Sequence, residues 1–202
     1  MRDIEIPEGV ERIGLDAFAK CSSLENVLLP QSLKAIERGV FWECTALREI
    51  TIPAGVSEIG DYAFKVCEEL ESVDLREGLV RIGASAFNYC QKLKNVTIPH
   101  TVKSIGSNAF RFCKGLESLV IPDVEIEIGR DAFNYCGDIP NIDIPERIRK
   151  TIKFSSSDED EADDYEDEAD DYEGEADGCE AKADDVELKE VDLNINVDEL
   201  PF

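Results

Sequence analysis

Cysteine is the residue type with the greatest chemical potential in this chain, and its spacing is regular. Six of the seven cysteines recur every 23 residues, at positions 21, 44, 67, 90, 113 and 136, and the seventh is Cys179. Thiols can act as nucleophiles, zinc ligands or disulfide partners. No C-x-x-C pair and no His–Cys spacing supports a zinc site. If the period reflects stacked copies, the six cysteines form a buried column of small hydrophobes.

Such a column would hold reduced thiols, which favours an intracellular compartment. Neighbouring coils about 4.8 Å apart would still bring the thiols within disulfide reach. Distance alone therefore leaves pairing within the column open. Cys179 lies outside the column and is expected to be exposed.

The single histidine, His100, is the other candidate for chemistry. Glu77 and Asp123 lie 23 residues before and after it, an arrangement that resembles a general base with orienting carboxylates. No serine or cysteine nucleophile falls in a neighbouring column, and the chain has no Walker sequence and no G-x-G-x-x-G. We therefore predict a surface turn histidine, no enzyme, no metal and no cofactor.

The 23-residue period extends to residues with no chemistry. AFNYC stands at 86–90 and again at 132–136, a separation of two periods. Phenylalanine falls at 18, 41, 64, 87, 110 and 133, and isoleucine at 13, 36, 59, 82, 105 and 128. A period of this length with fixed apolar positions predicts a solenoid whose coils share one core, because one unit is too small to bury its own.

Two patterns alternate within each copy. Stretches such as LENVLLP and LKNVTIP follow L-x-x-[VIL]-x-[LI], which predicts a short strand with one face inward. The pattern I-G-x-x-A-F-x-x-C is typical of a short helical piece. Its glycine, at 14, 60, 83, 106 and 129, is expected to supply a positive φ at the bend. Together these patterns predict an α/β solenoid with a parallel sheet.

The pattern I-G-x-x-A-F-x-x-C-x-x-L-x-x-V-x-I-P resembles the BspA-like leucine-rich repeats over about residues 4–145. The resemblance implies a horseshoe-like, right-handed coil with a concave parallel sheet that serves recognition. Secreted bacterial members of the family are associated with adhesion to host proteins. Glu37 in the glycine column, Arg76 in the proline column and Glu125 in an apolar column depart from the pattern.

Charge divides the chain into a repeat domain, residues 1–154, and an acidic low-complexity segment, residues 155–202. The second part holds 22 Asp/Glu and 2 Lys and is expected to be a disordered tail. Its layout after leucine-rich repeats is similar to that of the acidic leucine-rich nuclear phosphoproteins, which implies binding of histones or other basic proteins. Ser155, Ser156 and Ser157 each precede an acid by three residues and are phosphorylation candidates.

Two faces of the solenoid are candidate protein-binding surfaces. The concave face presents Asn26, Leu28, Glu49, Thr51, Ser72, Asp74, Asn95, Thr97, Ser118, Val120, Asn141 and Asp143. The convex side carries an apolar stripe of Trp42, Val66, Tyr89, Phe112 and Tyr135, which is either packing or a contact patch. The concave face lacks the basic stripe that direct binding of nucleic acid requires.

The sequence thus predicts a non-catalytic protein–protein interaction module. The alternatives are an acidic chaperone or sink for basic proteins, and an adhesin or surface-antigen fragment without its export signal. No signal peptide opens the chain and no apolar run spans a membrane. We therefore expect a cytoplasmic protein, with the nucleus as an alternative and secretion only for a fragment.

Overall fold

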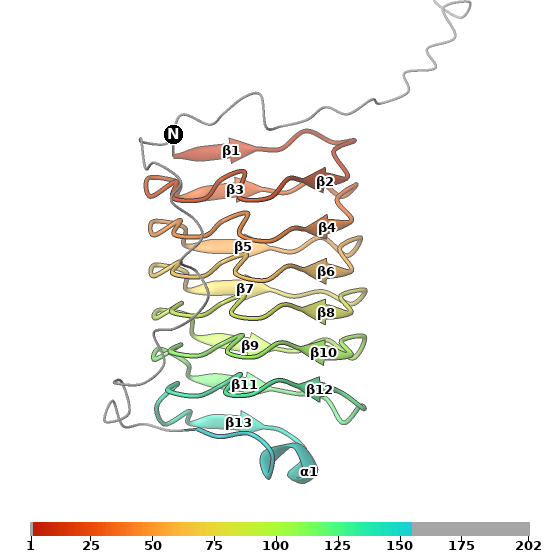
Figure 1. The fold of residues 1–202 in the computed structure, drawn as a ribbon, viewed down its shortest axis with the longest axis vertical. Helices are drawn as coiled ribbons and strands as arrows, with labels where there is room; N and C mark the ends of the chain where they lie inside the picture. The colour runs from red at the N-terminus through yellow and green to blue at the C-terminus, as the bar shows by residue number, and fades with distance from the viewer. Residues whose placement is uncertain (1, 155–202) are drawn as a thin grey trace, which may run out of the picture.

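The computed structural model describes residues 2–154, which wind into a stack of coils (Figure 1). One parallel sheet has the order β1 (Asp3–Glu5), β3 (Asn26–Leu28), β5 (Glu49–Thr51), β7 (Ser72–Asp74), β9 (Asn95–Thr97), β11 (Ser118–Val120) and β13 (Asn141–Asp143). A second parallel sheet has the order β12 (Glu127–Ile128), β10 (Ser104–Ile105), β8 (Arg81–Ile82), β6 (Glu58–Ile59), β4 (Ala35–Ile36) and β2 (Arg12–Ile13). The two ladders follow the long axis of the molecule (Figure 1).

In both sheets, residues that pair on neighbouring strands are one sequence period apart. Ile4 pairs with Val27, and Leu119 pairs with Ile142, each partner lying 23 residues along the chain. The middle residue of each strand of the seven-stranded sheet points inward, so its two neighbours point outward. The predicted parallel sheet and its alternation are therefore confirmed.

The predicted helical pieces are wrong, and the α/β class is corrected to a parallel β-solenoid. The segment that follows each strand of the second sheet is a run of turns, in which two columns adopt positive φ. Tyr62 and Val66, for example, have φ values of 60° and 63°. Because of these positive φ values, alternate N–H groups donate to carbonyls of the next coil, as Phe41 N does to Ala63 O at 2.8 Å. They do not form the hydrogen bonds within the segment that a helix requires.

The repeat glycines have a different role from the one expected. Gly60, Gly83, Gly106 and Gly129 are not among the residues with positive φ. A Cβ on any of the four would lie 2.3 to 2.6 Å from backbone atoms of the preceding coil. Glycine is therefore required there for the close approach of two backbones.

A ladder of phenylalanine rings forms the centre of the core. Successive rings from Phe18 to Phe133 are parallel within 15°, with centroids 5.1 to 5.5 Å apart. Phe154 lies 6.5 Å from Phe133 and continues the ladder at its lower end. The short helix α1 (Glu146–Arg149) covers the same end with the buried Ile148. None of the described helices has the length and apolar character of a membrane span.

Candidate binding surfaces

The outward residues of the seven-stranded sheet form two regular lanes, as the sequence predicts. The first lane is Asn26, Glu49, Ser72, Asn95, Ser118 and Asn141, and the second is Leu28, Thr51, Asp74, Thr97, Val120 and Asp143. All are exposed except Ser118 and Val120, which are half-buried. Leu28 exposes 61% of its surface, the largest apolar exposure on this face. Which of these residues contact a partner stays a prediction.

A groove of about 540 Å³ lies at the carboxyl ends of strands β7, β9, β11 and β13. Its apolar wall includes Val120 and the prolines that end the strands, Pro99, Pro122 and Pro145. Its polar lining includes Glu77, Asp123 and Asp143. Because Pro lacks a backbone N–H, these strand ends do not extend their ladder further, and the hollow forms where pairing stops. The groove is an acidic, partly apolar concavity that continues the sheet face.

His100 lines this groove and contacts only one of the two acids predicted to flank it. Its Nδ1 is 3.2 Å from Glu77 Oε1, and its backbone N–H donates to the same oxygen at 3.1 Å. The hydrogen bond from that backbone N–H is the main reason that the pKa of Glu77 lies below its ordinary value. Asp123 instead accepts two hydrogen bonds from Arg147, at 2.9 and 3.0 Å. The predicted arrangement of a base with two carboxylates therefore does not form.

The six repeat cysteines form the predicted buried column, and all are free thiols. Each thiol after the first donates to the carbonyl of a phenylalanine on the preceding coil, as in Cys90 Sγ to Phe64 O at 3.2 Å. Burial raises the pKa of Cys67, Cys90 and Cys113, which suppresses the reactive thiolate. Within residues 2–154, no group of three or more His, Cys, Asp or Glu side chains is placed to hold a metal ion.

The apolar stripe lies deeper than an exposed patch would. Trp42, Val66 and Tyr89 are half-buried, and Phe112 and Tyr135 are only 4% and 6% exposed. The rings of Tyr89, Phe112 and Tyr135 stack with centroids 4.4 and 4.8 Å apart. Cationic side chains cover the stripe at both ends: Lys20 lies over Trp42, and Arg111 lies over Phe112 and Tyr135. This geometry favours the packing interpretation over an open apolar contact patch.

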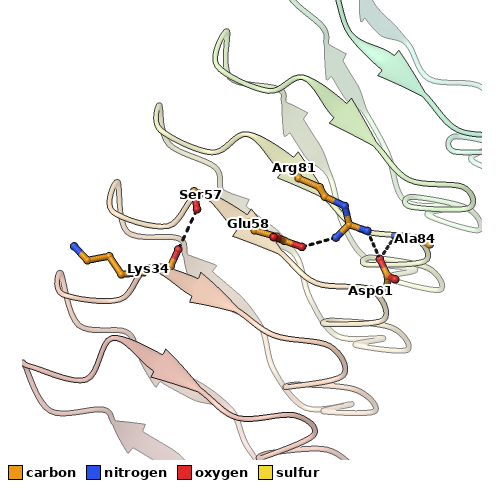
Figure 2. A network of polar contacts seen from close by, with 6 residues as sticks. All are labelled: Lys34, Ser57, Glu58, Asp61, Arg81 and Ala84. Carbon is orange, nitrogen blue, oxygen red and sulfur yellow. Dashed lines mark hydrogen bonds and ion pairs between the residues drawn. The ribbon is translucent and has the colours of Figure 1, made fainter. Parts of the chain in front are cut away.

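A polar network on the second sheet was not predicted. Arg81 donates to Glu58 at 2.6 Å and to Asp61 at 2.7 Å, and Asp61 also accepts from the backbone N–H of Ala84 at 2.8 Å (Figure 2). A smaller hollow of about 240 Å³ lies beside it. The pair Glu58–Arg81 is separated by one period, so the repeat arithmetic could have found it. The network joins neighbouring coils and has the character of a structural clamp.

The remaining predictions lie outside the described residues. They are the disorder of residues 155–202, the exposure of Cys179, and the phosphorylation candidates Ser155, Ser156 and Ser157.

Comparison with known proteins places this geometry among repeat proteins. The family model described as the BspA type leucine rich repeat region, in six copies, matches residues 1–115 and 80–158. A leucine-rich repeat protein from Bacteroides ovatus is 31% identical with a TM-score of 0.50; the match covers 76% of this chain and 51% of that one. The leucine-rich repeat protein of T. pallidum is 26% identical with a TM-score of 0.63, over 76% and 85% of the two chains. This chain thus spans about half the length of the first relative. No curated protein matches it in sequence.

Proposed function

Because the chain belongs to the BspA-type leucine-rich repeat family, we propose that it is a non-catalytic binding module for another protein. Its contact surface is the seven-stranded face together with the groove at the carboxyl ends of β7 to β13. The observation that carries the proposal is the groove itself, a hollow of about 540 Å³ continuous with a rigid sheet face of outward side chains.

The dimensions of the sheet explain why the groove is needed. Seven strands about 4.8 Å apart span about 29 Å, and the three residues of each strand add about 10 Å. The flat area is about 290 Å², well below the roughly 800 Å² that each partner buries in a standard interface. The groove and its rim therefore supply part of the contact area.

Charge defines the class of partner. Glu77, Asp123 and Asp143 line the groove, while Glu49 and Asp74 lie exposed on the strands beside it, Asp74 being paired with Arg76. His100 is the only basic residue in the lining, and the nearby Arg147 is already paired with Asp123. The complementary partner is a basic segment that also carries an apolar side chain for the proline-lined wall. Electrostatic complementarity of this kind raises specificity and association rate more than affinity.

A selection from a random peptide library on the full chain tests the proposal. We expect enrichment of sequences that combine Lys or Arg with Leu, Ile or Val. Val120→Arg places a cation in the groove and should abolish binding of the selected peptides. Leu15→Arg, at an exposed apolar position outside both the sheet face and the groove, is the matched control and should leave binding unchanged. Equal effects of the two variants, or enrichment of acidic peptides, would contradict the proposal.

A second candidate function rests on the composition of residues 155–202. Their 22 acidic and 2 basic residues favour an acidic sink for basic proteins such as histones. Binding of histones should then weaken steeply with salt and disappear in a chain that ends at residue 154. Val120→Arg should not affect it, so the two candidates are separable.

A further inference from the structure

The surface over coils four to six combines stacked rings with cations. We call it the aromatic–guanidinium surface and define it by Tyr89, Arg111, Phe112, Lys114 and Tyr135. The Arg111 guanidinium carbon lies 4.6 Å from the Phe112 ring centre and 5.0 Å from that of Tyr135. Lys114 Nζ lies 5.7 Å from the Phe112 ring centre. Such cation–π contacts hold the positive charges in place against the rings.

The part of this surface that faces solvent is cationic rather than apolar. Phe112 and Tyr135 are buried, whereas Arg111 is half-buried and Lys114 is exposed. Among the described residues no carboxylate pairs with Arg111, and its buried Nε has no hydrogen-bond partner. The turn segments of coils four and five, residues 83–92 and 106–115, contain no Asp or Glu. The corresponding segment of coil six holds Asp131, which accepts a hydrogen bond from Asn134, and the exposed Asp138.

The chain itself carries the complementary segment. Residues 158–173, DEDEADDYEDEADDYE, hold twelve carboxylates and two tyrosines and no cation. We propose that this acidic segment binds the aromatic–guanidinium surface of its own chain. Arg111 is the central contact, because a guanidinium fixed by stacking can accept a carboxylate in a paired, bidentate geometry.

The position of the segment in the chain supports binding within one molecule. The described residues end at Phe154, which packs against Phe133 on the coil that also carries Tyr135. Four further residues, each spanning up to about 3.5 Å, allow Asp158 to reach at most about 14 Å from that point. Arg111 is one coil away, about 4.8 Å along the axis. A short tether of this kind gives an effective concentration of about a millimolar.

Paramagnetic relaxation enhancement on the full chain tests this assignment. A spin label is attached at Ala169→Cys in a Cys179→Ser background, where the six remaining thiols are buried. The backbone amides of Arg111, Phe112 and Tyr135 should lose several times more intensity than those of Lys20 and Glu43. The last two occupy the same column on coils one and two and serve as the internal reference. Salt at 1 M, where screening acts over about 3 Å, should remove the difference.

Two variants separate the specific contact from general charge attraction. Arg111→Gln with Lys114→Gln should abolish the selective loss of intensity. Lys34→Gln with Arg48→Gln removes the same charge from exposed positions elsewhere and should preserve it. Equal enhancement along the column, persistence in 1 M salt, or equal effects of the two double variants would overturn the proposal. So would an equally strong enhancement in chains without a spin label when they are mixed with spin-labelled chains, since another copy would then be the occupant.

Discussion

Gly83→Ala is the sharpest test of how closely the coils are packed. The added Cβ would lie 2.5 Å from the backbone nitrogen of Asp61 and 2.5 Å from the carbonyl carbon of Gly60. Optimal contacts are about 3.5–4.0 Å, so two backbones would have to separate by about 1 Å. Overpacking of this kind costs about 1–3 kcal/mol of unfolding free energy. At about 2–4 °C per kcal/mol for a chain of this size, the melting temperature should fall by roughly 2–12 °C.

The chain contains its own control for this substitution. Glu37 occupies the equivalent position on coil two, and there the Phe18 and Phe41 centroids are 5.5 Å apart, against 5.1 to 5.2 Å for the other pairs of the ladder. The wider step lies in the direction that a Cβ requires. Glu37→Ala should therefore lose only the exposed ion pair with Arg12, which is worth at most about 1 kcal/mol.

Urea unfolding monitored by far-UV circular dichroism and by the single tryptophan, Trp42, measures these changes. Gly83→Asn distinguishes the close approach from a left-handed backbone, since asparagine tolerates positive φ better than alanine. We expect Gly83→Asn to be at least as destabilising as Gly83→Ala. If asparagine restores the stability that alanine loses, or if alanine leaves the midpoint unchanged, the close-approach argument is refuted.

Three further predictions follow from the turns, the thiols and the clamp. Val66 is β-branched at a φ of 63°, so Val66→Asn should raise the unfolding free energy by about 1 kcal/mol, and a lower urea midpoint would contradict this. Burial raises the pKa of Cys67, Cys90 and Cys113, so their contribution to stability is full below about pH 8.5, where unfolded thiols ionise, and is lost as pH rises toward the raised pKa values. The urea midpoint in reducing buffer should therefore fall above about pH 8.5. A urea midpoint that does not change with pH would count against buried thiols. Arg81→Met should lower the unfolding free energy by less than about 1 kcal/mol and reduce its salt dependence, whereas a larger loss would mean that the clamp is more than a surface ion pair.

The 23-residue period predicted the contacts between equivalent positions on neighbouring coils. Residues 23 apart must lie side by side, so the strand register, the thiol column and the contact between Glu77 and His100 could be derived from the sequence. It could not assign Asp123, because its partner Arg147 lies 24 residues away, outside the column.

Conformation within a coil was harder to predict. Apolar residues at the spacing of Ile59, Ala63, Phe64 and Cys67 suit a helix as well as a chain of turns. Nothing in the side chains of Tyr62 or Val66 signals the positive φ that decides between them. The column in which a residue falls also does not predict how deeply its side chain is buried. It aligned Tyr89, Phe112 and Tyr135 but did not show that Arg111, in the adjacent column, folds over the rings.

The hydrogen bonds that join the coils also determine how the molecule would respond to tension. They run along the stack, and the two ends of the described chain lie at opposite ends of it (Figure 1). A force applied through the two ends therefore acts on the hydrogen bonds between one pair of neighbouring coils at a time. Each rupture releases 23 residues, a gain in contour length of about 80 Å at about 3.5 Å per residue. The solenoid would therefore extend in steps of equal length, each set by the 23-residue period.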